Sequence, residues 1–232
     1  MLVIGHRGAG GLAPENTLEA LRAGADADAD VLEFDVRLTS DKIPVVIHDN
    51  TTLRTHHQHI TISSTTLADL QAKTQEHPIP TLAAVLDEFF GRILLNIELK
   101  SRGSSVVVAD LIANKYIKKP ADWDNVLFSS FKAEELIAIR RTHEHANLAL
   151  LHGQNPFIFI AYHRRLQLTA VGFHRLYVNR FALEIAKKLG LFAYAYTVDR
   201  PYGALLLDRE GIDGVVTNRP DIILDEINKN KK

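Results

Sequence analysis

The chain of 232 residues is 46% hydrophobic and 24% charged, with a formal net charge of −1. This composition is that of a globular protein and gives no bias toward nucleic acid. No cysteine is present, which excludes disulfides and leaves any metal to oxygen or imidazole ligands.

The length suits one large domain over residues 1–232. No stretch approaches the roughly 20 apolar residues of a membrane span. We therefore expect a cytoplasmic protein without stable membrane insertion. The sequence is compatible with a homo-oligomer, and residues 228–232 are expected to form a solvated tail.

Apolar, β-branched runs alternate with helical patterns along most of the chain. The predicted strands are residues 2–5, 31–38, 93–99, 126–131, 148–151, 170–174, 192–198 and 214–217, with an extra strand at 45–48 that pairs back on the second. The predicted helices are one that starts near residue 14 and continues to 27, then 81–90, 104–117, 133–143, 180–189, 202–209 and 221–227. This order is typical of parallel strands joined by crossover helices. It predicts an α/β fold, a closed (β/α)8 TIM barrel, with a doubly wound open sheet as the main alternative.

Residues 50–80 interrupt this alternation with a polar segment, which predicts a small insertion after the second strand. A connection of this length is more often a lid or a binding loop than a plain linker. The segment contains His56, His57 and His59. We do not interpret them as a zinc site, because the run supplies no fourth ligand.

Two predicted strands carry polar residues on one face. Side chains on a strand alternate between faces, so each polar set points the same way. The polar sets are Glu33, Asp35 and Arg37 in the first strand, and Asn96, Glu98 and Lys100 in and just after the second. An exposed edge strand would explain one such face. Two together favour a functional site at the C-terminal ends of barrel strands, where a barrel has its active site.

Three of these residues, Glu33, Asp35 and Glu98, are carboxylates that would repel one another if they converged. A hard divalent cation with oxygen ligands would relieve that repulsion. The sequence therefore predicts one Mg²⁺ or Ca²⁺ ion.

Two histidines, His6 and His48, each stand where an apolar run breaks into polar residues. A single histidine at a strand end is usually structural. A pair beside carboxylates favours general acid–base catalysis, because imidazole can hold or release a proton near neutral pH. Arg7 and Lys100 could neutralise carboxylates, but with a metal present we interpret them as phosphate donors.

Asn16 and residues 211–220 have two interpretations each. Asn16 is three residues before Glu19, as in a helix-capping box, and is equally suited to contact a ligand. Residues 211–220 end the last strand, where many barrels bind phosphate, or they simply close the barrel.

An ordered set of motifs over about residues 3–221 resembles the glycerophosphodiester phosphodiesterase family. The motifs are His6-Arg7-Gly8, Pro14-Glu15-Asn16-Thr17, Glu33-Phe34-Asp35-Val36 with Thr39 and Asp41, Val46-Ile47-His48-Asp49, Asn96-Ile97-Glu98-Leu99-Lys100, Ser129-Ser130-Phe131, Thr197-Val198-Asp199 and residues 213–221. Each motif is weak alone, and together they are specific.

The resemblance implies a (β/α)8 barrel with an insertion after the second strand. It implies Glu33, Asp35 and Glu98 as ligands of Mg²⁺ or Ca²⁺, His6 and His48 as the acid–base pair, and Arg7 and Lys100 as phosphate ligands. Two features depart from the family pattern. Tyr196 stands where the family usually has tryptophan, and the stretch after His48 is shorter and lacks the usual Asn-Gly turn. We expect both departures to change which substrate fits the site more than they change the reaction itself. Tyr196 is therefore a predicted substrate contact.

The expected activity is hydrolysis of a small-molecule glycerophosphodiester, such as glycerophosphocholine or glycerophosphoethanolamine, to glycerol 3-phosphate and an alcohol. One alternative is a lysophospholipase D-type activity on a substrate with one acyl chain. Another, from a different class, is a non-catalytic phosphoester-binding barrel. A metal-dependent aldolase or isomerase would explain only one of the two histidines.

Overall fold

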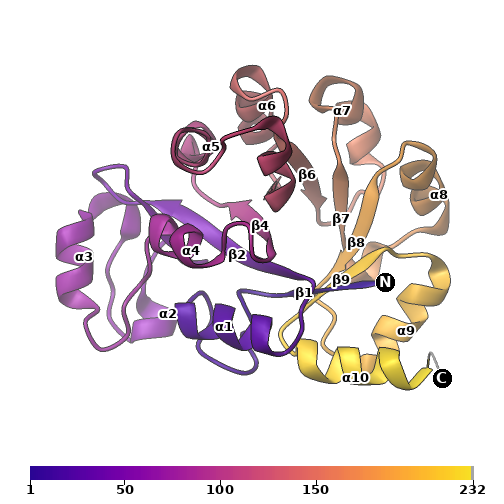
Figure 1. The fold of residues 1–232 in the computed structure, drawn as a ribbon, viewed down its shortest axis with the longest axis horizontal. Helices are drawn as coiled ribbons and strands as arrows, with labels where there is room; N and C mark the ends of the chain where they lie inside the picture. Colours follow the sequence, from indigo (N-terminus) through magenta and orange to yellow (C-terminus); the bar gives the residue numbers. More distant parts are fainter. Residues whose placement is uncertain (231–232) are drawn as a thin grey trace.

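The computed structural model describes residues 1–230 and shows a sheet of nine strands, all parallel except β3. The parallel strands are β1 (Leu2–Gly5), β2 (Val31–Leu38), β4 (Leu94–Leu99), β5 (Val126–Ser130), β6 (Asn147–His152), β7 (Ala170–His174), β8 (Phe192–Tyr196) and β9 (Gly214–Thr217). Because β1 pairs with both β9 and β2, the sheet closes on itself. The predicted (β/α)8 barrel is confirmed, and the open-sheet alternative is wrong (Figure 1).

Helices surround the barrel, as Figure 1 shows. They are α1 (Leu18–Asp26), α4 (Leu82–Phe89), α5 (Ser104–Lys115), α6 (Ala133–Thr142), α7 (Ile158–Leu166), α8 (Arg180–Lys188), α9 (Pro201–Glu210) and α10 (Pro220–Asn230). The sequence did not predict α7, whose buried residues are Phe159 and Leu166 alone, too few for a clear helical repeat. The expected tail from residue 228 is exposed as far as Asn230 but continues α10 there, and its last two residues lie outside the described ones.

The strands separate two apolar regions. Outward-facing side chains such as Phe34, Phe128 and Phe173 belong to the core against the helices. Inward-facing side chains such as Ile4 and Tyr194 form a second, smaller cluster inside the barrel. Because side chains alternate along a strand, β2 sends Phe34 outward and the two acidic residues on either side of it inward. The polar side chains are therefore inside the mouth of the barrel.

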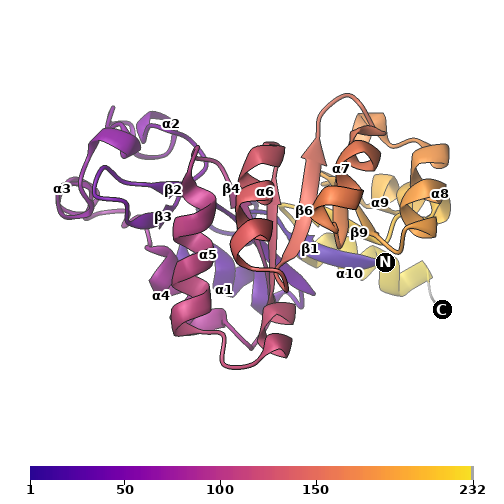
Figure 2. The ribbon, with the colours of Figure 1, turned by 90° about the horizontal axis from the view of Figure 1, so that it is seen from above.

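The insertion follows β2 and begins with β3 (Pro44–Val46), which pairs antiparallel with β2. It continues through α2 (Leu53–His56), a 3-10 helix (Ile62–Ser64) and α3 (Leu67–Lys73). A small apolar cluster of its own stabilises it; the members are Val45, Ile47, Ile60, Ile62, Leu70 and Ile79. In Figure 2, β6 points upward, which places the C-terminal mouth at the top with α2 and α3 on one side of it. Among residues 1–230, no helix is both long enough and apolar enough to cross a lipid bilayer.

Candidate active site

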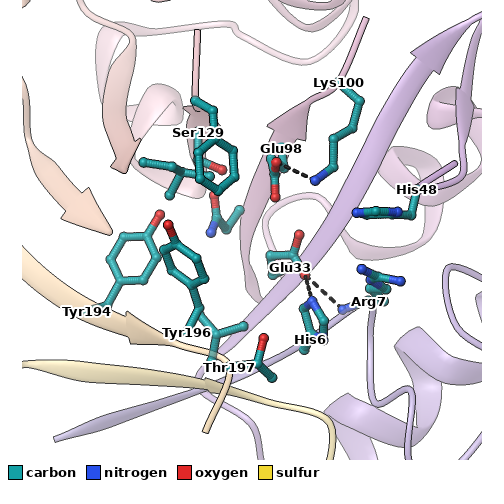
Figure 3. Close-up of a pocket in the computed structure, with 14 residues that line it drawn as sticks. His6, Arg7, Glu33, His48, Glu98, Lys100, Ser129, Tyr194, Tyr196 and Thr197 are labelled. Atoms are coloured by element: carbon teal, nitrogen blue, oxygen red, sulfur yellow. Dashed lines mark hydrogen bonds and ion pairs between the residues drawn. The ribbon is translucent and has the colours of Figure 1, made fainter. Parts of the chain in front are cut away.

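Three acidic side chains meet at the C-terminal ends of β2 and β4. Glu33 and Asp35 are buried residues of β2, and strand register places Asp35 directly beside Glu98 on β4. One carboxylate oxygen from each of the three lies within 4.8 Å of the others. The structure therefore brings together the three carboxylates that the sequence singled out as metal ligands. Figure 3 shows Glu33 and Glu98.

This cluster carries more negative charge than its surroundings neutralise. Burial, followed by the charge of Asp35, raises the pKa of Glu33 to about 8 and that of Glu98 to about 7. Burial also disfavours ionisation of Asp35, but Lys100 and Arg7 outweigh it and hold the pKa of Asp35 below its ordinary value. Oε1 of Glu33 is buried and has no hydrogen-bond partner within residues 1–230. A divalent cation would supply both the missing charge and a partner for this oxygen, so the residues present fit Mg²⁺ or Ca²⁺.

Two cations border the cluster. Lys100 Nζ lies 2.5 Å from Glu98 Oε1 and 3.1 Å from Asp35 Oδ1. Arg7 Nε lies 3.4 Å from Asp35 Oδ2, and its Nη1 donates to Glu15 Oε1 at 2.6 Å. Lys100 and Arg7 therefore both form ion pairs with carboxylates. Both also line the cavity described below, where an anionic ligand would meet them.

His6 follows β1 and is held by an amide. Its Nδ1 lies 2.7 Å from Asn218 Oδ1, while Asn218 donates from Nδ2 to Asp199 Oδ2 at 2.9 Å and from its backbone N to Asp199 Oδ1 at 2.8 Å. A carboxylate can only accept, so the Asn218 oxygen must face the ring, and a neutral His6 donates from Nδ1. Its Nε2 then has a free lone pair, 4.0 Å from Glu33 Oε2. Burial, with the charge of Arg7, lowers the pKa of His6 and favours this neutral form.

His48 lies two residues beyond β3 and is held by a carboxylate. Its Nδ1 donates to Asp49 Oδ1 at 2.6 Å, and the other oxygen of Asp49 accepts from Arg54 Nε at 2.7 Å. Burial lowers the pKa of His48, against the opposing charges of Asp35 and Asp49. Burial works against ionisation of Asp49 as well, but His48 and Arg54 bring its pKa down to about 2. Asp49 is thus a permanent anion beside the ring, and the Nε2 of His48 is the nitrogen left for chemistry.

A cavity of about 180 Å³ connects these groups. It is lined by His6, Arg7, Glu33, His48, Asn96, Glu98, Lys100, Ser129, Phe131, Leu151, Tyr194, Tyr196, Thr197 and Val216. In Figure 3 the tyrosines form a wall that faces the carboxylates and the two histidines. The hydroxyl of Tyr196 donates to the carbonyl of His152 at 2.7 Å, so its ring is the part that remains for a ligand.

Two histidines, two carboxylates and two cations thus line one cavity, and Asp35 lies beside them. A family model for the glycerophosphoryl diester phosphodiesterase family matches residues 6–222. The chain belongs to this family. The family resemblance and the expectation of an enzyme of this class are confirmed.

Several relatives of this phosphodiesterase match over nearly their whole length. It is 32% identical to YhdW of Bacillus subtilis, covering 97% of each chain, and 30% identical to a glycerophosphodiester phosphodiesterase of Caldanaerobacter subterraneus, covering 98% of each. Among solved structures, a phosphodiesterase of Oleispira antarctica in complex with the product sn-glycerol-3-phosphate has a TM-score of 0.86. That protein is 27% identical, with 98% of this chain and 97% of the other covered.

In this phosphodiesterase the side chain of Asn16 does not cap α1, which is one of the two roles that its sequence context predicts. The N-cap of α1 is Thr17, whose hydroxyl accepts from the backbone of Ala20, so the prediction of Asn16 as the cap is wrong. Asn16 instead donates from Nδ2 to Asp35 Oδ2 at 2.9 Å and accepts from the Asp35 backbone at 3.1 Å. It is absent from the lining of the cavity, so its predicted contact with substrate stays a prediction. What the structure shows is a side chain that orients a predicted metal ligand.

Two residues that sequence reasoning missed are Asn218 and Asp199. Both belong to the motifs that resemble the phosphodiesterase family, but neither was assigned a role, and residues 211–220 were interpreted as a phosphate loop or a barrel closure. Both are polar residues just beyond strand ends, which is the one signal that could have found them. Asn218 contacts His6 and Asp199 holds Asn218, and the contact between Asn218 and His6 depends on closure of the barrel.

Proposed function

We propose that the protein hydrolyses glycerophosphodiesters, such as glycerophosphocholine or glycerophosphoethanolamine, to glycerol 3-phosphate and an alcohol, with Mg²⁺ or Ca²⁺ held by Glu33, Asp35 and Glu98. The observation that carries the proposal is the meeting of two imidazoles, an acidic cluster and two cations in one cavity. The product bound in the Oleispira antarctica relative supports the glycerol phosphate half of the substrate. A cytoplasmic location stays a prediction.

The phosphodiester is an anion that repels nucleophiles, so the site must first neutralise it. Arg7 can present a planar pair of donors and Lys100 a single charge to the non-bridging oxygens of the phosphate. When bound, the divalent ion would add positive charge against the charge that develops in the transition state. Tyr196 would pack its ring against the bound substrate.

His6 is the better base for the first step. Its partner Asn218 is a neutral amide, its ring is buried, and its Nε2 holds a lone pair on the cavity side. His48 is the better acid, because the carboxylate of Asp49 stabilises the imidazolium form. We therefore infer that His6 removes a proton and that a protonated His48 supplies one.

The proposed reaction has two steps. His6 Nε2 takes the proton of the glycerol 2-hydroxyl, whose oxygen attacks phosphorus while the bond to the alcohol breaks and His48 protonates the departing oxygen. This forms a cyclic glycerol phosphate. In the second step His48, now neutral, takes a proton from water, which attacks phosphorus. His6 returns its proton to the 2-oxygen as the ring opens to glycerol 3-phosphate.

The test of the activity is release of glycerol 3-phosphate from glycerophosphocholine by purified protein, first with EDTA and then with Mg²⁺ or Ca²⁺ restored. We expect release that depends on the metal. Each histidine should contribute about 10²–10⁴-fold, so His6→Ala and His48→Ala should be folded and nearly inactive. His145→Ala is the matched control, because His145 is exposed and outside the cavity. Normal turnover in either active-site variant would contradict the assignment.

The two roles can be separated with a p-nitrophenyl ester of glycerol 3-phosphate. Its leaving group is a weak base that needs little protonation, so the acid becomes dispensable for the first step. We expect His48→Ala to regain p-nitrophenol release on this substrate while His6→Ala stays inactive. The reverse pattern would exchange the two roles.

A substrate with one acyl chain is a second candidate, because Phe131 and Tyr196 give the cavity an aromatic side, with ring centroids 5.9 Å apart. Assays of glycerophosphocholine and lysophosphatidylcholine side by side separate this lysophospholipase D-type activity from the first candidate. A non-catalytic phosphoester-binding barrel has no comparable support, because the catalytic groups converge in one cavity.

A further inference from the structure

Large apolar side chains are exposed at one half of the barrel mouth, on the four consecutive loops after β5, β6, β7 and β8 and on the first turns of the helices α8 and α9. We call them the apolar rim: Phe131, Phe157, Leu176, Tyr177, Phe181 and Tyr202. Their exposure ranges from 37% at Phe157 to 72% at Leu176. Isolated exposed apolar residues are ordinary on protein surfaces, but a group of them on one edge marks an interaction site.

Two residues of the rim, Phe131 and Tyr177, are connected to the active-site cavity by aromatic contacts. Aromatic contacts run from Phe131 to Tyr196 (5.9 Å between centroids), from Tyr196 to His174 (6.0 Å) and from His174 to Tyr177 (5.6 Å). Further along, Phe157 and Phe181 pack with centroids 6.2 Å apart. Whatever covers the rim therefore lies beside the entrance through which substrate arrives.

The insertion covers one half of the barrel mouth and leaves the other half open. The insertion lies over the half formed by the first strands, where Arg54 of α2 bonds Glu15 and Asp49. Figures 1 and 2 both show α3 of the insertion and α8 at opposite ends of the molecule. Within residues 1–230 no segment buries the apolar rim. This half of the mouth is free to meet a partner.

The charge on the rim indicates which partner. Arg175, Arg180 and Arg200 are exposed in the segments that follow β7 and β8, Arg180 as the first residue of α8, and none of them forms an ion pair within the part of the chain that the structure describes. Between the ends of β5, β6, β7 and β8 and the first residue of α6, α7, α8 and α9, the only acidic residue is Asp199, which is engaged by Asn218. One further exposed carboxylate, Glu134, lies in the first turn of α6. A second copy of the chain docked symmetrically on this face would bring the arginines of both copies together. An anionic surface would pair with them instead.

We propose that the apolar rim docks on an anionic lipid bilayer, with its side chains at the boundary between headgroups and acyl chains and the three arginines at lipid phosphates. Exposed apolar side chains flanked by basic residues are the combination that binds proteins reversibly to such an interface. Docking would turn the active-site cavity toward the lipid surface. This binding goes beyond the proposed hydrolysis and does not depend on it.

The test is co-sedimentation of the full-length protein with vesicles of phosphatidylcholine, with and without phosphatidylglycerol, at low and high salt. We expect binding to the anionic vesicles that weakens as salt rises. Leu176→Ser with Phe181→Ser should reduce the affinity by roughly tenfold or more, because both side chains lose apolar contact with lipid. Arg175→Gln with Arg180→Gln should reduce it about fivefold for each arginine at low salt.

Helix α8 offers matched controls at its other end. Leu189 is an exposed apolar residue, and Lys187 and Lys188 are exposed cations, all distant from the mouth. Leu189→Ser and the double variant Lys187→Gln with Lys188→Gln should therefore bind vesicles like the wild type. All of these variants should hydrolyse glycerophosphocholine in solution at the wild-type rate, if that activity is present.

Three outcomes would overturn the proposal: no sedimentation with anionic vesicles, equal binding by the rim variants and the wild type, or equal losses in the rim and control variants. Gel filtration adds a fourth. A dimer that the Leu176→Ser and Phe181→Ser substitutions abolish, without any lipid binding, would assign the rim to a second copy of the chain. Sedimentation needs no turnover, so failure of the proposed hydrolysis and failure of docking are separate results.

Discussion

Replacing Asn218 by alanine tests whether the amide between His6 and Asp199 positions the proposed base. The substitution removes the acceptor 2.7 Å from His6 Nδ1 and the donor 2.9 Å from Asp199. The ring could then rotate or change tautomer, and the imidazolium formed during the reaction would lose its partner. We expect kcat to fall while KM changes little, because Asn218 is absent from the cavity lining.

The size of the effect follows from the bond that is lost. A hydrogen bond to a charged group is worth about 1.5–3 kcal/mol, and His6 is charged only after it has taken the proton. Loss of that bond in the transition state corresponds to a decrease in kcat of about 10- to 150-fold. The acidic limb of the pH–rate profile should also move, because the Asn218 hydrogen bond raises the pKa of His6 in opposition to burial.

The assay is steady-state hydrolysis of glycerophosphocholine with saturating Mg²⁺ or Ca²⁺ over a series of pH values. Asn125→Ala is the control, since Asn125 donates a single side-chain hydrogen bond, to Asp122, just before β5 and away from the mouth. It should leave kcat unchanged. A folded Asn218→Ala protein with kcat within about twofold of the wild type would refute the reasoning, because the lost bond should cost at least about tenfold.

The other predictions concern the metal cluster and the core. Because folding raises the pKa of Glu33 to about 8 and of Glu98 to about 7, from 4.5, the folded protein binds more protons than the unfolded one in this window. The lowered pKa values of His6, His48 and His152 act in the opposite direction below the ordinary histidine value of 6.5. EDTA-treated protein should therefore lose stability as pH rises from about 6.5 to 8, and Mg²⁺ or Ca²⁺ should raise Tm most at the upper end; a metal-induced gain in Tm that is the same at every pH would contradict this. Asn16→Gly removes the amide that orients Asp35 but tolerates the positive φ of 59°, and it should weaken metal binding about 10- to 100-fold by calorimetry, whereas unchanged affinity would deny Asn16 that role. Phe34→Ala should lower the free energy of unfolding by about 3–5 kcal/mol in urea titrations, since its ring is fully buried between β2 and the helices, and a loss below about 1 kcal/mol would mean that the site collapses around the gap.

Strand periodicity was enough to predict the acidic cluster. Alternation places Glu33 and Asp35 on one face whatever the tertiary structure, and parallel neighbours in register then place Glu98 beside Asp35. The barrel follows from the alternation of strands and helices. The acidic cluster and the barrel depend on local sequence patterns and on a fold with few alternatives, so both could be predicted from the sequence.

Contacts that depend on closure could not be predicted in the same way. Asn218 and His6 are 212 positions apart, and no local pattern links them. The predicted cap of α1 was wrong by one residue because Asn16 and Thr17 are both residue types that cap helices. In the structure Asn16 is engaged by Asp35, and Thr17 is the cap. Helix α7 was missed because only Phe159 and Leu166 of its side chains are fully buried and its last turn is basic, so its apolar repeat is short.

The hydrogen bond between His6 and Asn218 also bears on when the protein becomes active during its synthesis. The strands that carry the three carboxylates are complete by Leu99, so a nascent chain contains the whole acidic cluster long before β9 leaves the ribosome. The proposed base gains its partner only when β9 has inserted between β8 and β1. Catalysis should therefore be acquired only after β9 is in place, and the appearance of activity in a translation reaction would report the moment at which the barrel closes.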